Sequence, residues 1–357
     1  MYGDYPDLKC VKKILVVKMR HHGDVLLTSP IFTLLKKNMP HAEVHAFIYK
    51  DTLPMLEGHP AIAQFHLYDR GWKKLSLLKK LSQEVATLRK IRKEKYDLVI
   101  NLTEGDRGAI VAFISNAQFR VGFDPENKGF KGKKKIYTHT VKNCKTPRHT
   151  VEKQLDVLRR IGIFPELKER DLCLHISEEA KSSVRAHLPV KEGYIVIHPV
   201  SRWRFKCLPP KKIAELIIAL HARGFPIVLS ASPDIEELAM CEEILKEAPG
   251  IPVCHLGGKI SLKELGALIK GSKCLICVDS VPLHIASATK TPVIALFGPT
   301  SDQNWGPWMH PQARVVAQKT SCRPCLMDGC GGSKMSDCLF TLPISSILSA
   351  LDALALQ

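Results

Sequence analysis

Short apolar runs alternate with longer segments of helical periodicity along most of this chain. In the first half, runs rich in β-branched and aromatic residues predict strands at residues 12–19, 43–49, 64–69, 96–102 and 119–123. Helical spacing predicts helices at 25–40, 71–95, 109–116 and 149–163. Residues 122–150 are polar, basic and rich in glycine, and we expect a long loop there.

The second half repeats this alternation. Strands are expected at residues 194–199, 225–232, 251–258, 274–280 and 291–301, with helices between them and a terminal helix at 341–357. Two successive halves of this kind predict an α/β protein with two Rossmann-like domains, 1–175 and 176–357, each built on a mostly parallel sheet. In such sheets ligands bind at the carboxyl ends of the strands, and we expect a cleft between the two domains.

One predicted helix, residues 71–95, has an apolar stripe and a basic opposite face. The stripe consists of Leu75, Leu78, Leu81, Val85, Leu88 and Ile91, at spacings of three and four. We expect these side chains to pack on the domain core and the lysines opposite them to be solvated.

Composition adds a large positive charge to this picture. The 357 residues are 45% hydrophobic, as in a globular protein, and carry a formal net charge of +17. That charge predicts a polyanionic partner: nucleic acid, an anionic membrane leaflet or a phosphorylated substrate. No apolar run approaches the roughly 20 residues of a membrane-spanning helix, and the amino terminus does not resemble a signal peptide. We therefore expect a cytoplasmic protein.

Three cations follow the first strand of the second half, in the sequence HPVSRWRFKCLPP. Arg202, Arg204 and Lys206 lie between this strand and the next helix, where a helix amino terminus and fixed cations would suit a phosphate or diphosphate. The alternative is a solvated surface cluster. Lys206, next to the helix start, is the favoured ligand, and the two arginines need not both face inward.

A carboxylate follows the first strand of the first half, in MRHHGDVLLTSP. Gly23 suits a tight turn, and Asp24 is either an N-cap or a general base for an attacking hydroxyl. Position alone does not separate these two roles. His21 and His22 are further candidates for the base.

Two more loops follow strands of the second half. In CLICVDSVPLHIASATKTPVIALFGPTS, Asp279 is a cap or a ligand of sugar hydroxyls, Ser280 can cap, and His284 is a core residue or a phosphate contact. The turn at 298–301 closes the next strand. In LSASPDIEELAM, Glu236 or Glu237 could hold a ribose, although glutamates are common at helix starts.

Several nucleotide-binding motifs are absent from the sequence. It contains no Walker P-loop and no GxGxxG after a strand, which disfavours P-loop NTPases and ordinary dinucleotide dehydrogenases. It also contains no D-x-D, so a departing diphosphate would be neutralised by lysine, arginine and a helix dipole.

Twelve cysteines are present, most of them expected to be reduced and buried. Four of them form the pattern C-x2-C-x4-C-x7-C at Cys322, Cys325, Cys330 and Cys338. This spacing could hold a structural zinc, with free thiols or occasional disulfides as the alternative.

KILVVKMRHHGDVLLTSP, HPVSRWRFKCLP and VDSVPLHIASATKTPVIALFGPTS, in this order, resemble glycosyltransferase family 9, the bacterial lipopolysaccharide core heptosyltransferases, and most closely its heptosyltransferase III type. The resemblance runs over nearly the whole chain. It implies a GT-B fold, with two Rossmann-like domains facing across a cleft. It also implies inverting transfer of L-glycero-D-manno-heptose from ADP-heptose, as co-substrate, to an inner-core heptose of nascent lipopolysaccharide, with no cofactor required.

The resemblance also implies roles for individual residues. Asp24 matches the proposed catalytic base, Lys206 the lysine that meets the diphosphate, and Asp279 the aspartate that holds donor-sugar hydroxyls. His284 lies in the same donor motif, and Glu236 would be the glutamate near adenosine, with Glu237 competing. Further donor-side residues within these motifs are Ser201, Arg202, Ser280, Gly298 and Thr300. Val200, Leu208 and Val281 depart from residues common in relatives, which leaves the exact donor contacts open.

The expected partners follow from this reading. They are ADP-heptose, the nascent lipopolysaccharide inner core and an anionic membrane surface bound peripherally at the cytoplasmic face of the inner membrane. A GT-B transferase that uses another nucleotide sugar is the first alternative. A basic nucleic-acid-binding protein is the second, disfavoured because aromatic residues are only 6% and do not alternate with the cations.

Overall fold

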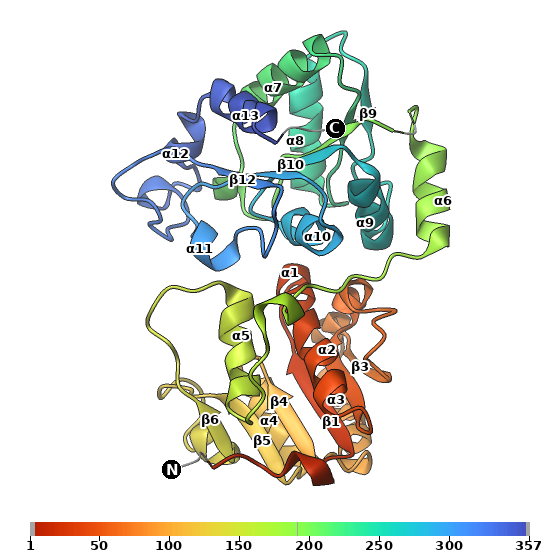
Figure 1. The fold of residues 1–357 in the computed structure, drawn as a ribbon, viewed down its shortest axis with the longest axis vertical. Coiled ribbons are helices and arrows are strands. Elements are labelled where there is room, and N and C mark those ends of the chain that lie inside the picture. The colour runs from red at the N-terminus through yellow and green to blue at the C-terminus, as the bar shows by residue number, and fades with distance from the viewer. Residues whose placement is uncertain (1–3, 191, 355–357) are drawn as a thin grey trace. The chain divides into compact units, whose positions relative to one another are not determined.

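The computed structural model describes residues 4–190 and 192–354. The chain divides into two compact units, Met1–His175 and Ile176–Gln357 (Figure 1). Each unit is built on one six-stranded parallel sheet, so the prediction of two Rossmann-like α/β units is confirmed.

The sheet of the first unit has the strand order β3-β2-β1-β4-β5-β6. Its strands are β1 Lys13–Lys18, β2 Glu43–Tyr49, β3 Gln64–Tyr68, β4 Leu98–Asn101, β5 Phe119–Phe123 and β6 His139–Val141. The helices between or after them are α1 His22–Leu26, α2 Ser29–Asn38, α3 Leu77–Lys93, α4 Asp106–Ser115 and α5 Thr150–Arg159.

The sheet of the second unit has the order β12-β11-β10-β7-β8-β9, which is the same topology. Its strands are β7 Ile195–His198, β8 Ile227–Leu229, β9 Val253–His255, β10 Cys274–Val278, β11 Val293–Leu296 and β12 Ala313–Val316. Its helices are α6 Glu178–His187, α7 Pro210–Ala222, α8 Ile235–Glu247, α9 Leu262–Gly271, α10 Val281–Thr289, α11 Asp302–Trp305, α12 Asp337–Phe340 and α13 Ile344–Asp352.

The central strands are buried along their whole length and almost entirely apolar, because helices cover both faces of each sheet. Every residue of β4, β7, β10 and β11 is buried. In each unit the strand order reverses next to the first strand, between β1 and β4 and between β7 and β10. In doubly wound folds the loops at such a reversal diverge and leave a crevice at the carboxyl edge, where ligands bind.

Three sequence predictions differ from the structure. Residues 25–40 form two helices, α1 and α2, separated by Leu27 and Thr28. The loop expected at 122–150 contains strand β6 and a short 3-10 helix, η4 (Lys133–Ile136). The edge strand β12 was not predicted at all.

The leucine stripe of α3 was predicted to pack on the core, and this is wrong for its amino-terminal half. Leu78 is 82% exposed and Leu81 59% exposed, and the preceding Leu75 is also exposed. Only the carboxyl-terminal half packs, since Val85 and Leu88 are half-buried and Ile91 is buried. The stripe therefore continues past the edge of the domain core.

Two buried histidines make the folded state sensitive to acid. His66 Nε2 and His45 Nδ1 each lie 2.8 Å from the Tyr96 hydroxyl, and His198 Nδ1 lies 3.0 Å from Ser230 Oγ. Burial lowers the pKa of both His66 and His198 to about 4. Both rings are therefore neutral in the folded protein at pH values where they are already protonated in the unfolded chain.

We predict that the free energy of unfolding decreases as the pH falls from about 6.5 to about 4. The unfolded state then binds protons that the folded state excludes, at a cost of about 3 kcal/mol for each ring at pH 4. Urea unfolding across this range measures the slope. H198N should flatten it, whereas H41N, at an exposed histidine, should not. An H198N slope equal to that of the wild type would contradict this account.

Candidate functional site

The three cations of the loop after β7 have different environments. Lys206, in the short 3-10 helix η6 (Arg204–Lys206), places Nζ 2.7 Å from Asp279 Oδ2. Arg202 is exposed and lies over the Trp203 ring at 5.4 Å, and Arg204 is exposed with Glu243 at 3.9 Å. Of the three, Lys206 alone is held against a neighbouring strand end.

The Lys206–Asp279 ion pair joins the two loops that border the crevice of the second unit. Asp279 directly follows β10, and its side chain is only 7% exposed, against 19% for Lys206. A lysine ammonium has three donors. One donor is used by Asp279, so the others can bind oxygen atoms of an anionic ligand. Lys206 and Asp279 are 73 positions apart in the sequence, yet their side chains form one ion pair.

The capping roles considered for this region are settled by the structure. Ser280 is the N-cap residue of α10, but its hydroxyl donates to the Val278 carbonyl at 3.3 Å and caps no amide. Asp279 lies one residue before the cap and pairs with Lys206. His284 is buried within α10. Pro282 lies in the first turn of α10.

The remaining donor-side candidates lie on neighbouring loops of the second unit. Gly298 follows β11, and a Cβ atom there would lie 2.6 Å from Leu339, so only glycine fits. The Thr300 hydroxyl is buried and has no hydrogen-bond partner among the described residues, which leaves it available to a ligand. Ser201 Oγ accepts from the Trp203 amide at 3.3 Å.

The two glutamates after β8 differ in burial. Glu237 is buried, and its Oε2 accepts a hydrogen bond from the Ser232 amide at 3.0 Å, which holds the loop. Glu236 is exposed. The N-cap of α8 is Asp234, whose carboxylate accepts from both glutamate amides. The expectation that Glu236 or Glu237 holds a ribose remains a prediction.

The cysteine loop, residues 319–338, supports the loops that follow β7 and β11 in this unit. Ser336 Oγ donates to the Phe205 carbonyl at 2.6 Å, next to Lys206. Arg323 Nε donates to the Gly298 carbonyl at 2.9 Å, and the Leu326 amide donates to the Pro299 carbonyl at 3.0 Å. The loop therefore fixes two strand ends relative to each other.

No group of three or more His, Cys, Asp or Glu side chains is placed to hold a metal ion within residues 4–190 and 192–354. The zinc alternative for Cys322, Cys325, Cys330 and Cys338 therefore has no support in the geometry. Cys330 Sγ instead accepts from the Asp337 amide at 3.3 Å, and burial raises the pKa of the Cys338 thiol. The expectation that most cysteines are buried is also wrong, because five of the twelve are buried and four are exposed.

In the first unit, Asp24 lies at the carboxyl edge next to the strand-order reversal. It belongs to the first turn of α1, whose N-cap is His21, so the N-cap alternative for Asp24 is wrong. His22 Nε2 lies 3.0 Å from the Asp51 carbonyl, and burial lowers the pKa of this ring. Lys18 is buried at the end of β1, and its charge interacts with that of Asp24.

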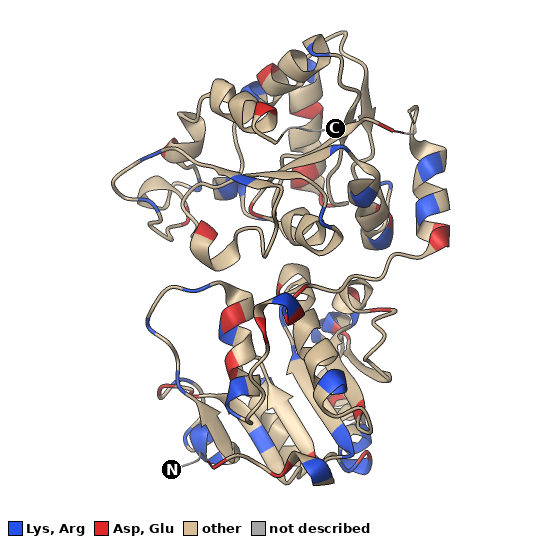
Figure 2. Cartoon of the chain, viewed as in Figure 1, with Lys and Arg blue, Asp and Glu red and all other residues tan. Residues whose placement is uncertain are grey.

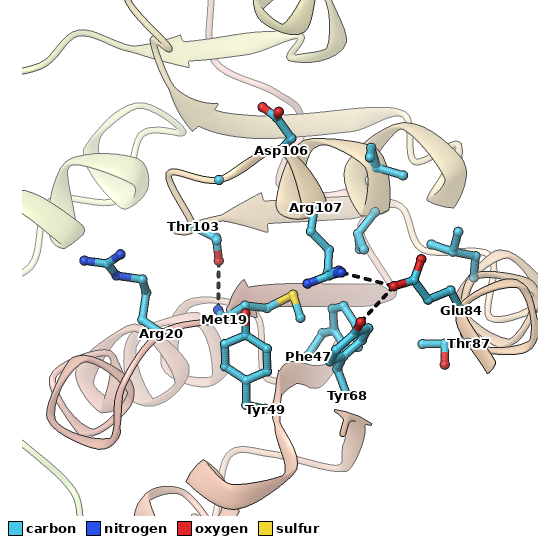
Figure 3. Close-up of a pocket in the computed structure, with 14 residues that line it drawn as sticks. Met19, Arg20, Phe47, Tyr49, Tyr68, Glu84, Thr87, Thr103, Asp106 and Arg107 are labelled. Carbon is cyan, nitrogen blue, oxygen red and sulfur yellow. Dashed lines mark hydrogen bonds and ion pairs between the residues drawn. The ribbon is translucent and has the colours of Figure 1, made fainter. Parts of the chain in front are cut away.

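A pocket of about 500 Å³ opens at the same edge (Figure 3). We call it the tyrosine pocket. It is lined by Met19, Arg20, Phe47, Tyr49, Tyr68, Glu84, Thr87, Leu88, Thr103, Gly105, Asp106, Arg107, Ile110 and Val111. These residues come from the ends of β1, β2 and β3, from the β4–α4 loop and from helices α3 and α4.

A carboxylate shared by two donors forms one wall of the tyrosine pocket. Glu84 Oε1 accepts from the Tyr68 hydroxyl at 2.8 Å and from Arg107 at 3.1 Å (Figure 3). The Arg107 guanidinium also lies over the Tyr68 ring, 4.2 Å from its centroid. Burial, followed by the bond to Glu84, raises the pKa of Tyr68 to about 12. Aromatic faces beside fixed charged groups suit a sugar ring with hydroxyl or phosphate substituents.

The tyrosine pocket was missed from the sequence. Tyr49 and Tyr68 end β2 and β3 and look like core aromatics, and Arg107 looks like a surface residue of a helix. Their common signal is position, because each lies at or just after the carboxyl end of a parallel strand. The basic loop at residues 122–150 also supports the tyrosine pocket. Its buried Lys133 donates to the carbonyl of Glu104, in the β4–α4 loop, at 2.7 Å.

Comparisons with known proteins agree with this arrangement. The model of glycosyltransferase family 9 (heptosyltransferase) matches residues 85–335. The chain belongs to this family. It is 37% identical over 291 residues to a lipopolysaccharide heptosyltransferase 3 of Escherichia coli, covering 81% of this chain and 84% of the relative. It is 36% identical to the enzyme of the same name from strain K12, over 81% and 83% of the two chains.

Solved structures share the GT-B fold of these family 9 transferases. The family 9 glycosyltransferase of Veillonella parvula superposes with a TM-score of 0.81 at 22% identity, over 96% of this chain and 97% of that one. The E. coli heptosyltransferase WaaC with ADP superposes with a TM-score of 0.75 at 20% identity, over 96% and 100%. The enzyme is thus a glycosyltransferase of GT-B fold, as the sequence motifs predicted.

We predict that K206M lowers the free energy of unfolding of this transferase by about 2 kcal/mol, because it leaves the buried Asp279 carboxylate unpaired. The double variant K206M/D279N should recover much of that loss. Denaturant unfolding of the two single variants and the double variant measures the coupling. Additive effects of the two substitutions would show that the pair contributes nothing to stability.

Proposed function

We propose that this glycosyltransferase moves L-glycero-D-manno-heptose from ADP-heptose to an inner-core heptose of lipopolysaccharide, with inversion at the anomeric carbon. The observation that carries the proposal is the Lys206–Asp279 pair at the reversal of strand order, in a chain whose relatives are named lipopolysaccharide heptosyltransferases. A structural neighbour was solved with ADP-2-deoxy-2-fluoro heptose. ADP-heptose is a co-substrate, and the proposal includes no cofactor.

On the donor side, Lys206 binds the diphosphate and Asp279 the sugar hydroxyls. The remaining ammonium donors of Lys206 stabilise the negative charge that develops as ADP leaves. Because Asp279 already fixes the Lys206 side chain, little reorganisation is needed when the donor binds. Ser201, Arg202, Ser280, His284, Gly298 and Thr300 complete the donor side in this proposal, together with Glu236 or Glu237.

Asp24 acts as the general base. Its carboxylate accepts the proton of the attacking acceptor hydroxyl, the hydroxyl oxygen forms a bond to the anomeric carbon, and ADP departs with the electrons of the broken C–O bond. The acceptor hydroxyl attacks the anomeric carbon from the face opposite the leaving group, so the configuration at that carbon inverts. Burial lowers the pKa of the neighbouring Lys18.

The tyrosine pocket receives the acceptor sugar. The half-buried Tyr49 gives the pocket an aromatic wall, while Arg107 and Glu84, held in place by the buried Tyr68, offer a cation and a carboxylate for hydroxyl or phosphate groups. In this proposal the first unit is the acceptor-binding domain and the second unit is the ADP-sugar donor-binding domain.

The nature of the acceptor suggests where the enzyme acts. We infer that it works in the cytoplasm at the inner face of the inner membrane, bound peripherally to an anionic surface. Within residues 4–190 and 192–354, no helix has the length and apolar character needed to cross a membrane. Transfer from another nucleotide sugar is the alternative, since Val200 and Leu208, both buried, differ from residues common in relatives.

We predict that D24N lowers kcat about 10²- to 10⁴-fold, because the amide cannot take the proton from the acceptor hydroxyl. Affinity for ADP-heptose should change less than twofold. The assay incubates enzyme, ADP-heptose and truncated lipopolysaccharide acceptors, and detects the added heptose by mass. E126Q, at an exposed loop carboxylate, is the matched control. Normal turnover by D24N would remove Asp24 from this role, and transfer only from another nucleotide sugar would favour the alternative donor.

We predict that R107Q raises the KM for the acceptor about tenfold or more, because a charged hydrogen-bond donor is lost from the pocket. The KM for ADP-heptose should stay unchanged. R89Q, at an exposed arginine of α3 that does not line the pocket, should leave both constants unchanged. An effect of R107Q on the donor constant alone would contradict the acceptor assignment.

A further inference from the structure

The amino-terminal half of α3 exposes a cluster of leucines without an apolar neighbour to cover them. Leu77 is 83% exposed and Leu78 82%, with Leu81 at 59%. Large apolar side chains exposed together on one short segment mark an interaction surface more often than isolated ones do. We call this segment, residues 72–81, the leucine turn.

Lysines surround these leucines. Lys73, Lys74 and Lys79 are exposed, and Lys80 is half-buried. None of the four forms an ion pair with a carboxylate in the part of the chain that the structure describes. The positive charge of this segment is therefore not neutralised by the protein itself.

The unit that carries the leucine turn also holds most of the positive charge. The first unit has 33 Lys and Arg against 19 Asp and Glu, a net charge of +14 out of +17 for the chain (Figure 2). An apolar surface that is ringed by cations on a basic domain is complementary to an anionic lipid leaflet, with apolar side chains for the acyl boundary and lysines for the headgroups.

The leucine turn is held firmly at both of its ends. Its first residue, Trp72, packs edge-to-face on Tyr68, with 4.6 Å between ring centroids. After it, Glu84 binds the Tyr68 hydroxyl and Arg107, and Ile91 is buried. The exposed leucines thus belong to an ordered helix, and their exposure is not the fraying of a loose end.

The helix α3 also forms a wall of the tyrosine pocket. Glu84, Thr87 and Leu88 line that pocket and lie one to three turns after the exposed leucines. If the leucine turn rests on a leaflet, the tyrosine pocket lies within a few helical turns of that leaflet. A lipid-anchored sugar would then reach the pocket from the membrane.

We propose that the leucine turn docks the enzyme on an anionic membrane, with Leu77, Leu78 and Leu81 entering the interface and Lys73, Lys74, Lys79 and Lys80 binding anionic headgroups. The link to a glycolipid acceptor rests on the proposed function, whereas the docking itself does not.

Flotation of the purified full-length protein with vesicles tests the docking. Wild-type protein should float with vesicles that contain anionic phospholipid at low salt, and binding to purely zwitterionic vesicles should be at least tenfold weaker. L77S/L78S/L81S should reduce binding to anionic vesicles about tenfold or more. These side chains are exposed, so circular dichroism and thermal unfolding should match the wild type.

Matched controls distinguish binding through this surface from non-specific apolar or electrostatic binding. L167S/I235S removes two other strongly exposed apolar side chains and should leave flotation unchanged. K73Q/K74Q/K79Q/K80Q should weaken binding at least tenfold, whereas K211Q/K246Q/K270Q/K319Q, at four exposed lysines of the second unit, should weaken it much less.

Several results would overturn the proposal. They are a wild-type protein that does not float, a triple-leucine variant that floats like the wild type, and a wild-type dimer that the leucine variant converts to a monomer. The last result would assign the surface to a second copy of the chain.

A transfer assay with a lipid-free acceptor separates docking from the proposed function. The leucine variant should retain wild-type kcat/KM on this soluble acceptor and lose activity only on acceptor embedded in vesicles. Normal flotation without heptose transfer to any acceptor would leave the docking intact and remove the function.

Discussion

The reversal of strand order beside the first strand of each sheet is the constraint on which the functional arrangement depends. β1 lies between β2 and β4, and β7 lies between β8 and β10. Helices that leave neighbouring strands on opposite faces must diverge, so the loops at that point open toward solvent and toward each other. Lys206 and Asp279 therefore meet although they are far apart in sequence. The same geometry places Asp24 and the β4–α4 loop at one edge of the first sheet.

Both candidate sites contain a cation held by a carboxylate. Lys206 is held by Asp279, and Arg107 is held by Glu84. Such a pair fixes a long, flexible side chain before the ligand arrives, and the unused donors of the cation remain available. In the second unit the support extends further, since Ser336 and Arg323 of the cysteine loop bind the backbone of the loops that follow β7 and β11. The cysteine loop thus has a structural role that does not depend on a metal ion.

Much of this architecture could be predicted because buried parallel strands have a strong apolar signature. β6 and β12 were not predicted because each is an edge strand with only one buried residue, which leaves a weak apolar signature. Sequence motifs pointed to the loops of the proposed donor side, but no motif marked Tyr68 or Arg107, because their surroundings depend on what lies beside them in three dimensions. The leucines of α3 show a further limit. Periodicity establishes that side chains share a helix face, but it does not establish that another element covers that face.

A single continuous helix joins the exposed leucines of α3 to the pocket wall at Glu84. Each residue of an α-helix turns the chain by about 100° and advances it by about 1.5 Å. An insertion or deletion between Leu81 and Glu84 would therefore rotate one end of the helix against the other. The two ends therefore keep their relative orientation only if the length of the segment between them changes by about one whole turn.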